Sequence, residues 1–449
     1  MKIGVIGAGS GIFSLNLIKD LCLTPRLHNS TVCFMDIDGE RLNAAYTLCS
    51  RYAREVGMNL QISKTLDREE CLRDADFVIC TALVGGYKGW KEGWEIGKKW
   101  GFRWGGSLHL MHDEAFWINF YQFRMMEDVL LDTMRICPNA WLLMVSNPVL
   151  AGITYLKRKY PNAKLVGLCH GYSGVYNLAK RLNFDPEKMT YQIPGVNHFV
   201  WLNRFTYEGK DAFPLVDKWV KEQSEEYFKT CRFSDGTGPK IVDMYKRYGV
   251  FPIGDTGNPG GGAWGWFYHT DEQVEKQWNE DPDTWFKNYF EESNRNVALV
   301  KKAAFDEDAK ASDLVGTEAS HEQIIPLIES IYCDIERVLI VNVLNDRLSV
   351  PGVPQDFEVE VPALVSARGI QPIATEPLPK PIIAYIYRDR IAPVEMELEA
   401  IRTQSRDLLV DLVMMDPFCH SRAQAEGLVE DILNLPYHTE MKEWYEGGK

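Results

Sequence analysis

The sequence has few cationic side chains for its length. It holds 49 Lys and Arg against 63 Asp and Glu, and its formal net charge is −14 at pH 7. Proteins that bind nucleic acids use clustered Lys and Arg to neutralise phosphates. The composition therefore argues against a nucleic-acid partner and indicates a small-molecule ligand.

The sequence also lacks paired cysteines and long apolar runs. Its ten cysteines are scattered, with no Cys-x-x-Cys pair, so neither a disulfide framework nor a zinc ribbon is indicated. The N-terminus offers no signal-peptide pattern, and no run of roughly 18 apolar residues follows. We therefore expect a cytoplasmic protein that does not contact a membrane.

What the chain does contain is an alternation of short apolar runs with helical patterns. Its 449 residues exceed the roughly 250–300 at which one hydrophobic core stops growing, so two domains are expected. The apolar runs predict buried parallel strands at residues 2–6, 31–35, 77–82, 141–145 and 165–168. Strands that alternate with helices indicate an α/β fold with a doubly wound parallel sheet.

A glycine-rich turn follows the first predicted strand. Gly7 permits a tight turn, and Gly9 lets the backbone approach a pyrophosphate. Ser10 and Gly11 complete the turn before a predicted helix, whose N-terminus favours a negative charge. The third glycine of the dinucleotide fingerprint is absent, because Ile12 stands in its place.

An acid ends the second predicted strand. Asp36 is placed to accept hydrogen bonds from a ribose diol, and it would repel a ribose phosphate. Strand, glycine turn, helix and acid occur in the order of a Rossmann unit, so we predict that NAD is bound in preference to NADP. The alternative is a structural turn in an α/β fold that binds no nucleotide.

The pattern changes after about residue 194. Aromatic and charged segments, a glycine cluster at 257–265, an apolar run at 357–361 and helical runs at 394–414 predict mixed helices and antiparallel strands. We therefore predict an NAD-binding Rossmann-type domain at 1–195 and a C-terminal α+β catalytic and oligomerisation domain at 196–449. This is the two-domain plan of lactate and malate dehydrogenases.

Polar residues follow the later predicted strands of the first domain. Asn147 comes after the run 141–145, where it could bind a hydroxyl group or the cofactor, or simply end the strand in a turn with Pro148. Cys169 comes after the run 165–168, and His198 lies downstream. Sulfur and nitrogen ligands suit a divalent transition metal. Considered separately, however, buried cysteines and histidines are more often structural.

The segment 244–257 carries another candidate site. Asp255 lies in a glycine-rich irregular loop, which is a common place for catalytic groups, although a lone Asp is more often a solvated surface acid. Tyr245, Lys246 and Tyr248 precede it in the same segment.

Taken together and in order, these motifs resemble glycoside hydrolase family 4, the NAD- and metal-dependent glycosidases. The likeness spans nearly the whole chain and rests on Gly7-Ala8-Gly9-Ser10, Ser146-Asn147-Pro148, Cys169-His170-Gly171-Tyr172, Gly195-Val196-Asn197-His198, Val341-Asn342-Val343-Leu344-Asn345 and Val359-Glu360-Val361-Pro362. Cys-His-Gly after the strand is similar to the uronidase group of the family. The resemblance implies a homodimer or homotetramer.

The resemblance also implies roles for individual residues. Cys169 and His198 would hold the metal, usually Mn²⁺, and Asp255 would be the base that removes the C2 proton, with Tyr245 or Tyr248 as alternatives. His170 would protonate the leaving oxygen. Substrate contacts are expected from Asn147, Asn197 and Lys246, with Arg124 as another possible partner of the substrate carboxylate. The stretch 105–114, which contains His109, His112, Asp113 and Glu114, is left without an assigned role.

The implied reaction is hydrolysis of an α-linked uronic acid glycoside, with an α-glucuronide preferred and an α-galacturonide as the alternative. It proceeds by oxidation at C3, elimination across C1 and C2, addition of water and re-reduction, unlike the usual mechanism with paired carboxylates. Two rivals remain. A malate- or lactate-type dehydrogenase needs an Arg clamp and a His–Asp pair, and this pattern is not found in the sequence. A non-enzymatic NAD-sensing or sugar-binding module would leave the metal ligands without a role.

Overall fold

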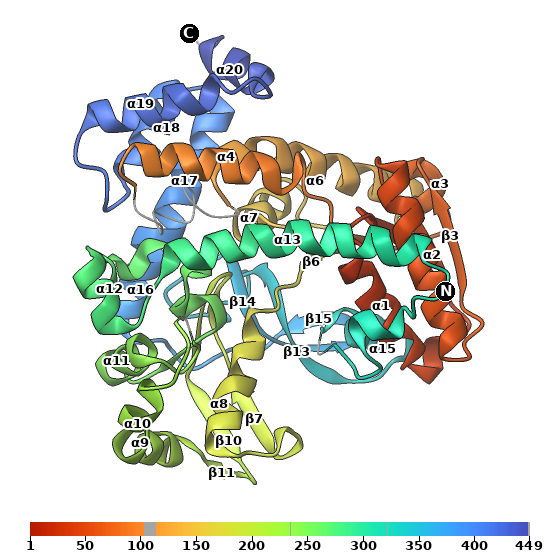
Figure 1. Ribbon diagram of the computed structural model, residues 1–449, viewed down its shortest axis with the longest axis horizontal. Helices are drawn as coiled ribbons and strands as arrows, with labels where there is room; N and C mark the ends of the chain where they lie inside the picture. Colours follow the sequence, from red (N-terminus) through yellow and green to blue (C-terminus); the bar gives the residue numbers. More distant parts are fainter. Residues whose placement is uncertain (103–113, 234, 321, 448–449) are drawn as a thin grey trace.

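The computed structural model contains one 12-stranded mixed sheet that runs through most of the molecule (Figure 1). The structure describes residues 1–102, 114–233, 235–320 and 322–447. In sheet order the strands are β12 (Phe251–Ile253), β9 (Phe199–Leu202), β8 (Gly195–Val196), β14 (Glu358–Ser366), β13 (Arg337–Leu344), β6 (Leu165–Gly167), β5 (Trp141–Met144), β4 (Phe77–Cys80), β1 (Lys2–Ile6), β2 (Thr31–Met35) and β3 (Gln61–Thr65), with β15 (Gly369–Pro372) on β14.

The N-terminal half of the sheet is a Rossmann fold. Strands β3, β2, β1, β4, β5 and β6 are all parallel and stand in this order. The order places the switch point between β1 and β4, and ligands of such sheets bind outside the carboxyl ends of the strands at that point. The predicted α/β class and doubly wound parallel sheet are confirmed.

Strand β3 was not among the predicted strands. Its sequence, Gln-Ile-Ser-Lys-Thr, is mostly polar, and its side chains are exposed or half-buried. It lies at the edge of the sheet and pairs only with β2 among the strands described. Polar side chains on an edge strand protect its free side from pairing with other chains. They also remove the apolar run by which the other parallel strands were recognised.

The antiparallel strands of the C-terminal half extend the same sheet. Strand β13 pairs with β6 through Asn342 and Gly167, and β14, β8, β9 and β12 follow in antiparallel order. The predicted strand at 357–361 lies largely within β14. A domain boundary at residue 195 stays a prediction, and β8 begins at that residue as part of the shared sheet.

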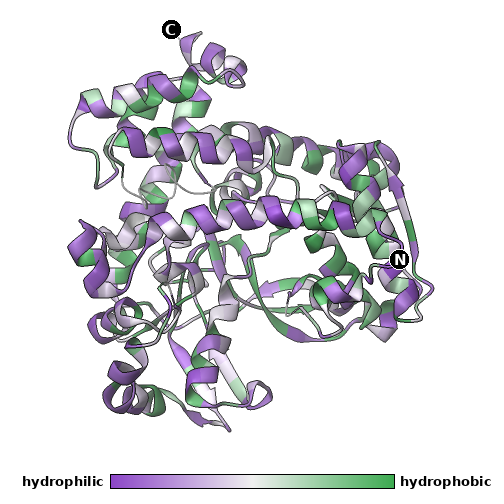
Figure 2. Ribbon diagram, in the orientation of Figure 1, coloured by the Kyte–Doolittle hydropathy of each residue, from purple (hydrophilic) through white to green (hydrophobic). Residues whose placement is uncertain are grey.

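Helices cover both faces of the Rossmann half. Helices α1, α2, α13 and α15 pack on one face, and α3, α6 and α7 on the other. Their bounds are α1 (Ile12–Cys22), α2 (Gly39–Glu55), α3 (Arg68–Leu72), α6 (Phe116–Ile136), α7 (Val149–Lys159), α13 (Pro282–Phe305) and α15 (Ile324–Cys333). Figure 2 shows apolar residues on the strands and the inner sides of the helices, with hydrophilic residues outside. Asp38 precedes helix α2, and its carboxylate caps the first turn by accepting hydrogen bonds from the backbone N–H of Glu40 and Arg41.

The remaining elements form two peripheral parts, which lie at opposite ends of the view in Figure 1. A small sheet of β7 (Met189–Gln192), β10 (Arg204–Tyr207) and β11 (Lys210–Asp211) packs with α8 (Gly174–Leu182), α9 (Phe213–Glu222), α10 (Ser224–Phe228) and α11 (Pro239–Tyr248). Helices α17 (Ala392–Thr403), α18 (Arg406–Met414), α19 (Arg422–Leu433) and α20 (Thr439–Glu446) pack with α4 (Gly86–Lys99). The other α-helices of the described residues are α12 (Glu272–Trp278), α14 (Ser312–Val315) and α16 (Lys380–Ile386). Within the described ranges, no helix combines the length and apolar character that crossing a bilayer requires.

Candidate active site

The glycine turn lies at the carboxyl end of β1, at the switch point of the sheet. Gly7 has φ +87°, and a Cβ there would come 2.6 Å from the backbone nitrogen of Ala82. A Cβ on Gly9 would come 2.7 Å from Oδ2 of Asp36, to which the N–H of Gly9 donates a hydrogen bond of 2.8 Å. Both glycines are therefore required by the close approach of neighbouring chain segments. Asp36 is held at the turn, as the Rossmann interpretation requires.

Gly11, at the end of the turn, makes a close contact with a distant helix. A Cβ at Gly11 would come 2.5 Å from a methyl group of Val300 on α13. The glycine therefore lets the long helix α13 pack against the start of α1. A hollow of about 170 Å³ lies beside this contact and is lined by Gly9, Ser10, Gly11, Ile12, Phe13, Arg41, Ala44, Tyr87, Ser293, Asn296, Val297, Val300 and Lys301. Its glycine turn and its two cationic side chains suit a phosphate-bearing ligand.

Three potential metal ligands converge at the carboxyl edge of the sheet. Cys169 follows β6, His198 lies in the turn between β8 and β9, and Asp255 lies in the short helical turn Gly254–Gly257 after β12. One ligand atom from each of the three lies within 4.8 Å of the others. Nε2 of His198 lies 3.6 Å from Oδ2 of Asp255. Residues separated by up to 86 positions thus form one cluster.

The donor set of this cluster fits a divalent transition metal. Sulfur, imidazole nitrogen and carboxylate oxygen together suit such ions. Burial raises the pKa of the Cys169 thiol well above its ordinary value, and the carboxylates of Glu360 and Asp255 add to the shift. A bound cation reverses this effect by stabilising the thiolate, so metal binding at this site would release a proton.

His170, the residue after the cysteine, is held by an acid that was not predicted. Its Nδ1 lies 3.2 Å from Oε1 of Glu322, and this hydrogen bond raises the pKa of His170. Glu322 lies 152 positions along the chain, beyond the reach of any local pattern. The pair places a titratable imidazole beside the metal cluster.

Asn197 is anchored behind the cluster by two buried carboxylates. Its side-chain amide donates to Glu360 at 3.0 Å, and its backbone N–H donates to Glu358 at 3.1 Å. Burial raises the pKa of Glu360 to about 8 and that of Glu358 well above its usual range. These two bonds anchor Asn197 and hold the His198 turn in place. The alternation of Glu358 and Glu360 with valines in β14 is the signal that marks them in the sequence.

Asn147 lies after β5, at the same edge of the sheet. Its carbonyl accepts a hydrogen bond of 2.8 Å from the side-chain amide of Gln122, which also donates to the carbonyl of Ala82 at 3.0 Å. The carboxamide oxygen of Gln122 accepts from the N–H of Val84. Gln122 on α6 thus connects the loops that follow β4 and β5, and it was not among the residues predicted from the sequence.

The alternative bases and the candidate cations lie in other surroundings. The hydroxyl of Tyr245 donates to Asp217 on α9 at 2.7 Å, within the lobe of α9 and α11. Tyr248 packs against Trp201. Lys246 is exposed on α11. Arg124 pairs with Glu440 on the C-terminal helix α20. The structure brings together Cys169, His198 and Asp255, and it directs the Tyr245 hydroxyl and the Arg124 guanidinium to other partners.

The stretch left without an assigned role is only partly described. His109, His112 and Asp113 lie outside the described residues. Glu114 is fully buried, and its carboxylate accepts a hydrogen bond of 3.0 Å from the N–H of Leu150, at the start of α7. This residue supports the helix that follows Asn147.

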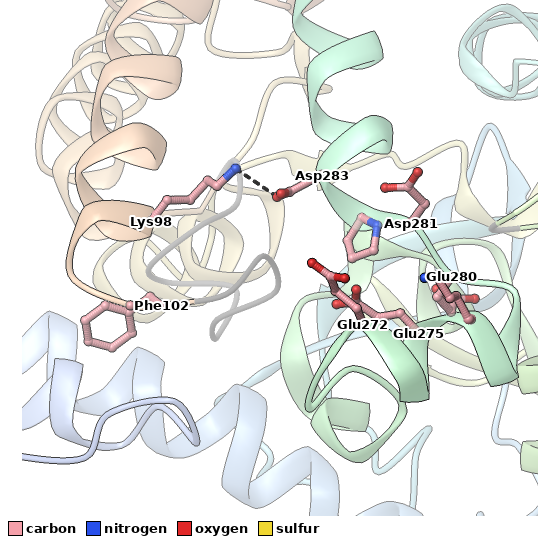
Figure 3. A pocket seen from close by; sticks show the side chains of 10 residues that line it. Lys98, Phe102, Glu272, Glu275, Glu280, Asp281 and Asp283 are labelled. Atoms are coloured by element: carbon pink, nitrogen blue, oxygen red, sulfur yellow. Dashed lines mark ion pairs between the residues drawn. The ribbon is translucent and has the colours of Figure 1, made fainter.

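A separate pocket of about 400 Å³ lies between the end of α4 and the start of α13 (Figure 3). Lys98 reaches across it to Asp283, at 3.0 Å. The other charged residues in its lining are Glu272, Glu275, Lys276, Glu280 and Asp281. Excess negative charge here disfavours an anionic ligand. No residue of the metal cluster lines this pocket, so we do not assign it to the reaction.

Comparison with known proteins identifies the family. The model of the family 4 glycosyl hydrolases matches residues 2–183, and the model of their C-terminal domain matches residues 193–419. The chain belongs to family 4 of the glycosyl hydrolases. The resemblance inferred from the motifs is therefore confirmed.

Family 4 relatives with different specificities align with nearly the whole of this chain. An α-galactosidase of Bacillus subtilis is 26% identical over 97% of this chain and 96% of its own. An α-galacturonidase of Lachnoclostridium phytofermentans is 24% identical over 99% of this chain and 97% of its own. The sugar that this family member accepts therefore does not follow from family membership.

Solved structures show the same fold. A 6-phospho-α-glucosidase from gut microorganisms, solved in complex with NAD and Mn²⁺, matches with a TM-score of 0.77 at 18% identity, covering 96% of this chain and 97% of that one. A malate dehydrogenase of Cryptosporidium parvum matches with a TM-score of 0.51 at 16% identity, covering 89% of this chain and 98% of that one. The predicted dehydrogenase-like plan is confirmed.

Proposed function

We propose that this family 4 glycosyl hydrolase is an NAD- and divalent-metal-dependent α-glycosidase that hydrolyses α-glucuronides. The observation that carries the proposal is the convergence of Cys169, His198 and Asp255 at the sheet edge that also holds the glycine turn and Asp36. Family membership and the solved relative with NAD and Mn²⁺ support both cofactors. The motif Cys169-His170-Gly171 supports the uronide class by its resemblance to the uronidase group.

In this proposal the cofactors supply the redox step and the Lewis acid. NAD held at the glycine turn and Asp36 would supply a hydride acceptor for C3 of the sugar, and a metal held by Cys169 and His198 would supply a Lewis acid for the ketone at C3. The ketone acidifies the proton on C2. Asp255, with its side chain part-exposed beside His198, removes that proton, and the C1–O bond breaks. His170, oriented by Glu322, protonates the leaving oxygen. Water then adds across C1 and C2, and the hydride returns to C3.

Elimination predicts exchange at C2. Hydrolysis of an aryl α-glucuronide in heavy water, with NAD, Mn²⁺ and a thiol reductant, should yield a product carrying deuterium at C2, because that proton leaves and is replaced from solvent. An oxocarbenium mechanism leaves the C2–H bond untouched. The measurement is the C2 proton signal of the product by NMR.

The control for this experiment is unlabelled product incubated with the enzyme in heavy water, which measures exchange after release. Product that retains a full proton at C2 after hydrolysis would exclude elimination.

A second candidate substrate is the α-galacturonide, favoured by the full-length similarity to an α-galacturonidase. The two uronides differ only in the configuration of the C4 hydroxyl. We therefore propose comparing kcat/KM for p-nitrophenyl α-D-glucuronide and p-nitrophenyl α-D-galacturonide, since the aryl group is the same in both. Higher kcat/KM for the galacturonide would assign the second candidate.

Cofactor choice gives a further prediction. Asp36→Asn removes the charge and keeps an acceptor for the N–H of Gly9, while Arg41 and Lys301 remain in the lining of the adjacent hollow. We expect the preference for NAD over NADP to fall about tenfold, because roughly 1.4 kcal/mol of lost repulsion corresponds to that factor. The measurement is the Kd of each dinucleotide.

The matched control for Asp36→Asn is Asp38→Asn, which retains a good helix cap two residues away. An unchanged preference in Asp36→Asn would show that Asp36 does not face the ribose.

A further inference from the structure

A fully buried arginine lies behind the metal cluster. Arg390 belongs to a single π-helical turn, Tyr387–Ile391, between α16 and α17, and its side chain is completely inaccessible to solvent. Among the described residues, no carboxylate forms an ion pair with it, and the adjacent Asp389 pairs with Arg388 at 2.9 Å. Such turns are rare and occur frequently at functional sites. The carboxylates of Asp389, Glu114 and Asp255 act on its charge from outside ion-pair distance, so its direct contacts must explain its position.

The guanidinium instead binds backbone carbonyls of the site. Nη2 of Arg390 donates to the carbonyl of His198 at 3.3 Å and to the carbonyl of Gly261. Nη1 donates to the carbonyl of Asp389 at 2.9 Å. The guanidinium carbon also lies 5.0 Å from the ring centroid of Phe199, the residue after His198. One side chain therefore contacts two successive residues, His198 and Phe199.

Gly261 connects this contact to the third potential ligand. A Cβ on Gly261 would come 2.0 Å from the carbonyl oxygen of Asp255 and 3.3 Å from that of His198. The glycine is thus wedged between the backbones of two ligand residues. By binding the carbonyls of His198 and Gly261 together, Arg390 joins the β8–β9 turn to the loop that carries Asp255.

The conformation of His198 explains why such a contact is needed. Its φ is +57°, in the left-handed region that a residue with a Cβ seldom adopts. A conformation of this kind persists only where the surroundings hold it in place. The N–H of Asn197 is held by Glu358, and the carbonyl of His198 is held by Arg390, so the turn is restrained on both sides of the ligand.

We propose that Arg390 is a positioning residue of the metal centre. It holds the backbone of His198 in the left-handed conformation and keeps the imidazole turned toward Asp255 and Cys169. The inference rests on the metal centre of the proposed function. Groups that orient metal ligands typically contribute 10- to 100-fold to metal affinity. Arg390 should therefore act on metal affinity without touching the metal.

The test is a titration of the whole chain with Mn²⁺ in the absence of substrate. The EPR signal of free Mn²⁺ measures how much of the ion is bound and gives its Kd. Arg390→Met keeps the length and apolar stem of the side chain but removes the donors, and should raise the Kd for Mn²⁺ 10- to 100-fold. Arg390→Lys keeps the positive charge but has fewer N–H donors. Its Kd for Mn²⁺ should therefore lie between that of the parent and that of Arg390→Met. The Kd for NAD, measured by calorimetry, should change less than twofold. Arg402→Met, an exposed arginine of α17, is the control and should bind Mn²⁺ normally.

The outcomes separate the two proposals. Folded Arg390→Met that binds Mn²⁺ as tightly as the parent would overturn the positioning role, and so would a loss of thermal stability with no change in the Kd for Mn²⁺. If Arg390→Met does not fold, an unchanged Kd in Arg390→Lys overturns it equally. A parent protein that binds no Mn²⁺ would overturn the metal centre itself and this inference with it.

Discussion

Cys169→Ser is expected to lower kcat/KM by about a thousandfold. The Cys169 thiol is the soft ligand of the cluster, and the Lewis acid that it helps to hold is worth several kcal/mol in the transition state, at 1.36 kcal/mol for each tenfold change in rate. Serine is similar in size but a poor ligand for a transition metal. The measurements are steady-state kinetics and the Kd for Mn²⁺, which should rise in parallel with the loss of activity.

Removing the metal should have the same effect on the parent enzyme. A chelator should abolish its activity, and added Mn²⁺ should restore it. Cys419→Ser changes a part-exposed cysteine between α18 and α19 and should leave kinetics and metal affinity unchanged. Full activity of Cys169→Ser without metal would remove the basis for the metal centre.

Asp255→Asn is expected to slow hydrolysis and C2 exchange together, by about 100- to 10,000-fold, the usual contribution of a general base. Asparagine has the same shape and can still accept the hydrogen bond of 3.0 Å from Asn258, so the loop should be retained. A carboxylate oxygen of Asp255 also lies within 4.8 Å of the ligand atoms of Cys169 and His198. The Kd for Mn²⁺ therefore decides whether Asp255 acts as the base or as a metal ligand. As the base, Asp255 should leave that Kd within about tenfold of the parent value.

The matched control is Tyr245→Phe, the change at the alternative base. In the parent, the hydroxyl of Tyr245 donates a hydrogen bond to Asp217. We therefore expect the rates of hydrolysis and C2 exchange to fall less in Tyr245→Phe than in Asp255→Asn. The Kd for Mn²⁺ could rise as much in Asp255→Asn as in Cys169→Ser. That result would show that Asp255 acts mainly as a metal ligand and not as the base. A larger effect of Tyr245→Phe on C2 exchange would make the tyrosine the base.

The parallel part of the fold was predictable because its strands are buried on both faces. The run Lys2–Ile6 is nearly continuous in apolar residues, and the glycine turn and Asp36 follow in the Rossmann order. Strand β3 escaped prediction because it is a polar edge strand. The sequence also did not predict that both halves share one sheet. The two halves are joined by the pairing of Asn342 with Gly167, and no local sequence pattern indicates this pairing.

The candidate site divides in the same way. Cys169 and His198 could be proposed as metal ligands, and Asp255 as the base, because the motifs around them resemble a family. Gln122, Glu322 and Arg390 could not, since each acts on a residue far away in the sequence. Arg390, for example, lies 192 positions from His198. Such contacts are set by packing between distant elements.

The sequence by itself determined the Rossmann unit and the family, because apolar periodicity, glycines with a steric purpose and short motifs are local properties of a chain. Only the tertiary structure decided that Asp255 lies 3.6 Å from His198, that Glu322 holds His170 and that Arg390 clamps the His198 turn. The physical reason is that antiparallel strands pair according to their packing against the whole sheet. The side chains that meet at the sheet edge are therefore chosen by its strand order, which no single segment encodes.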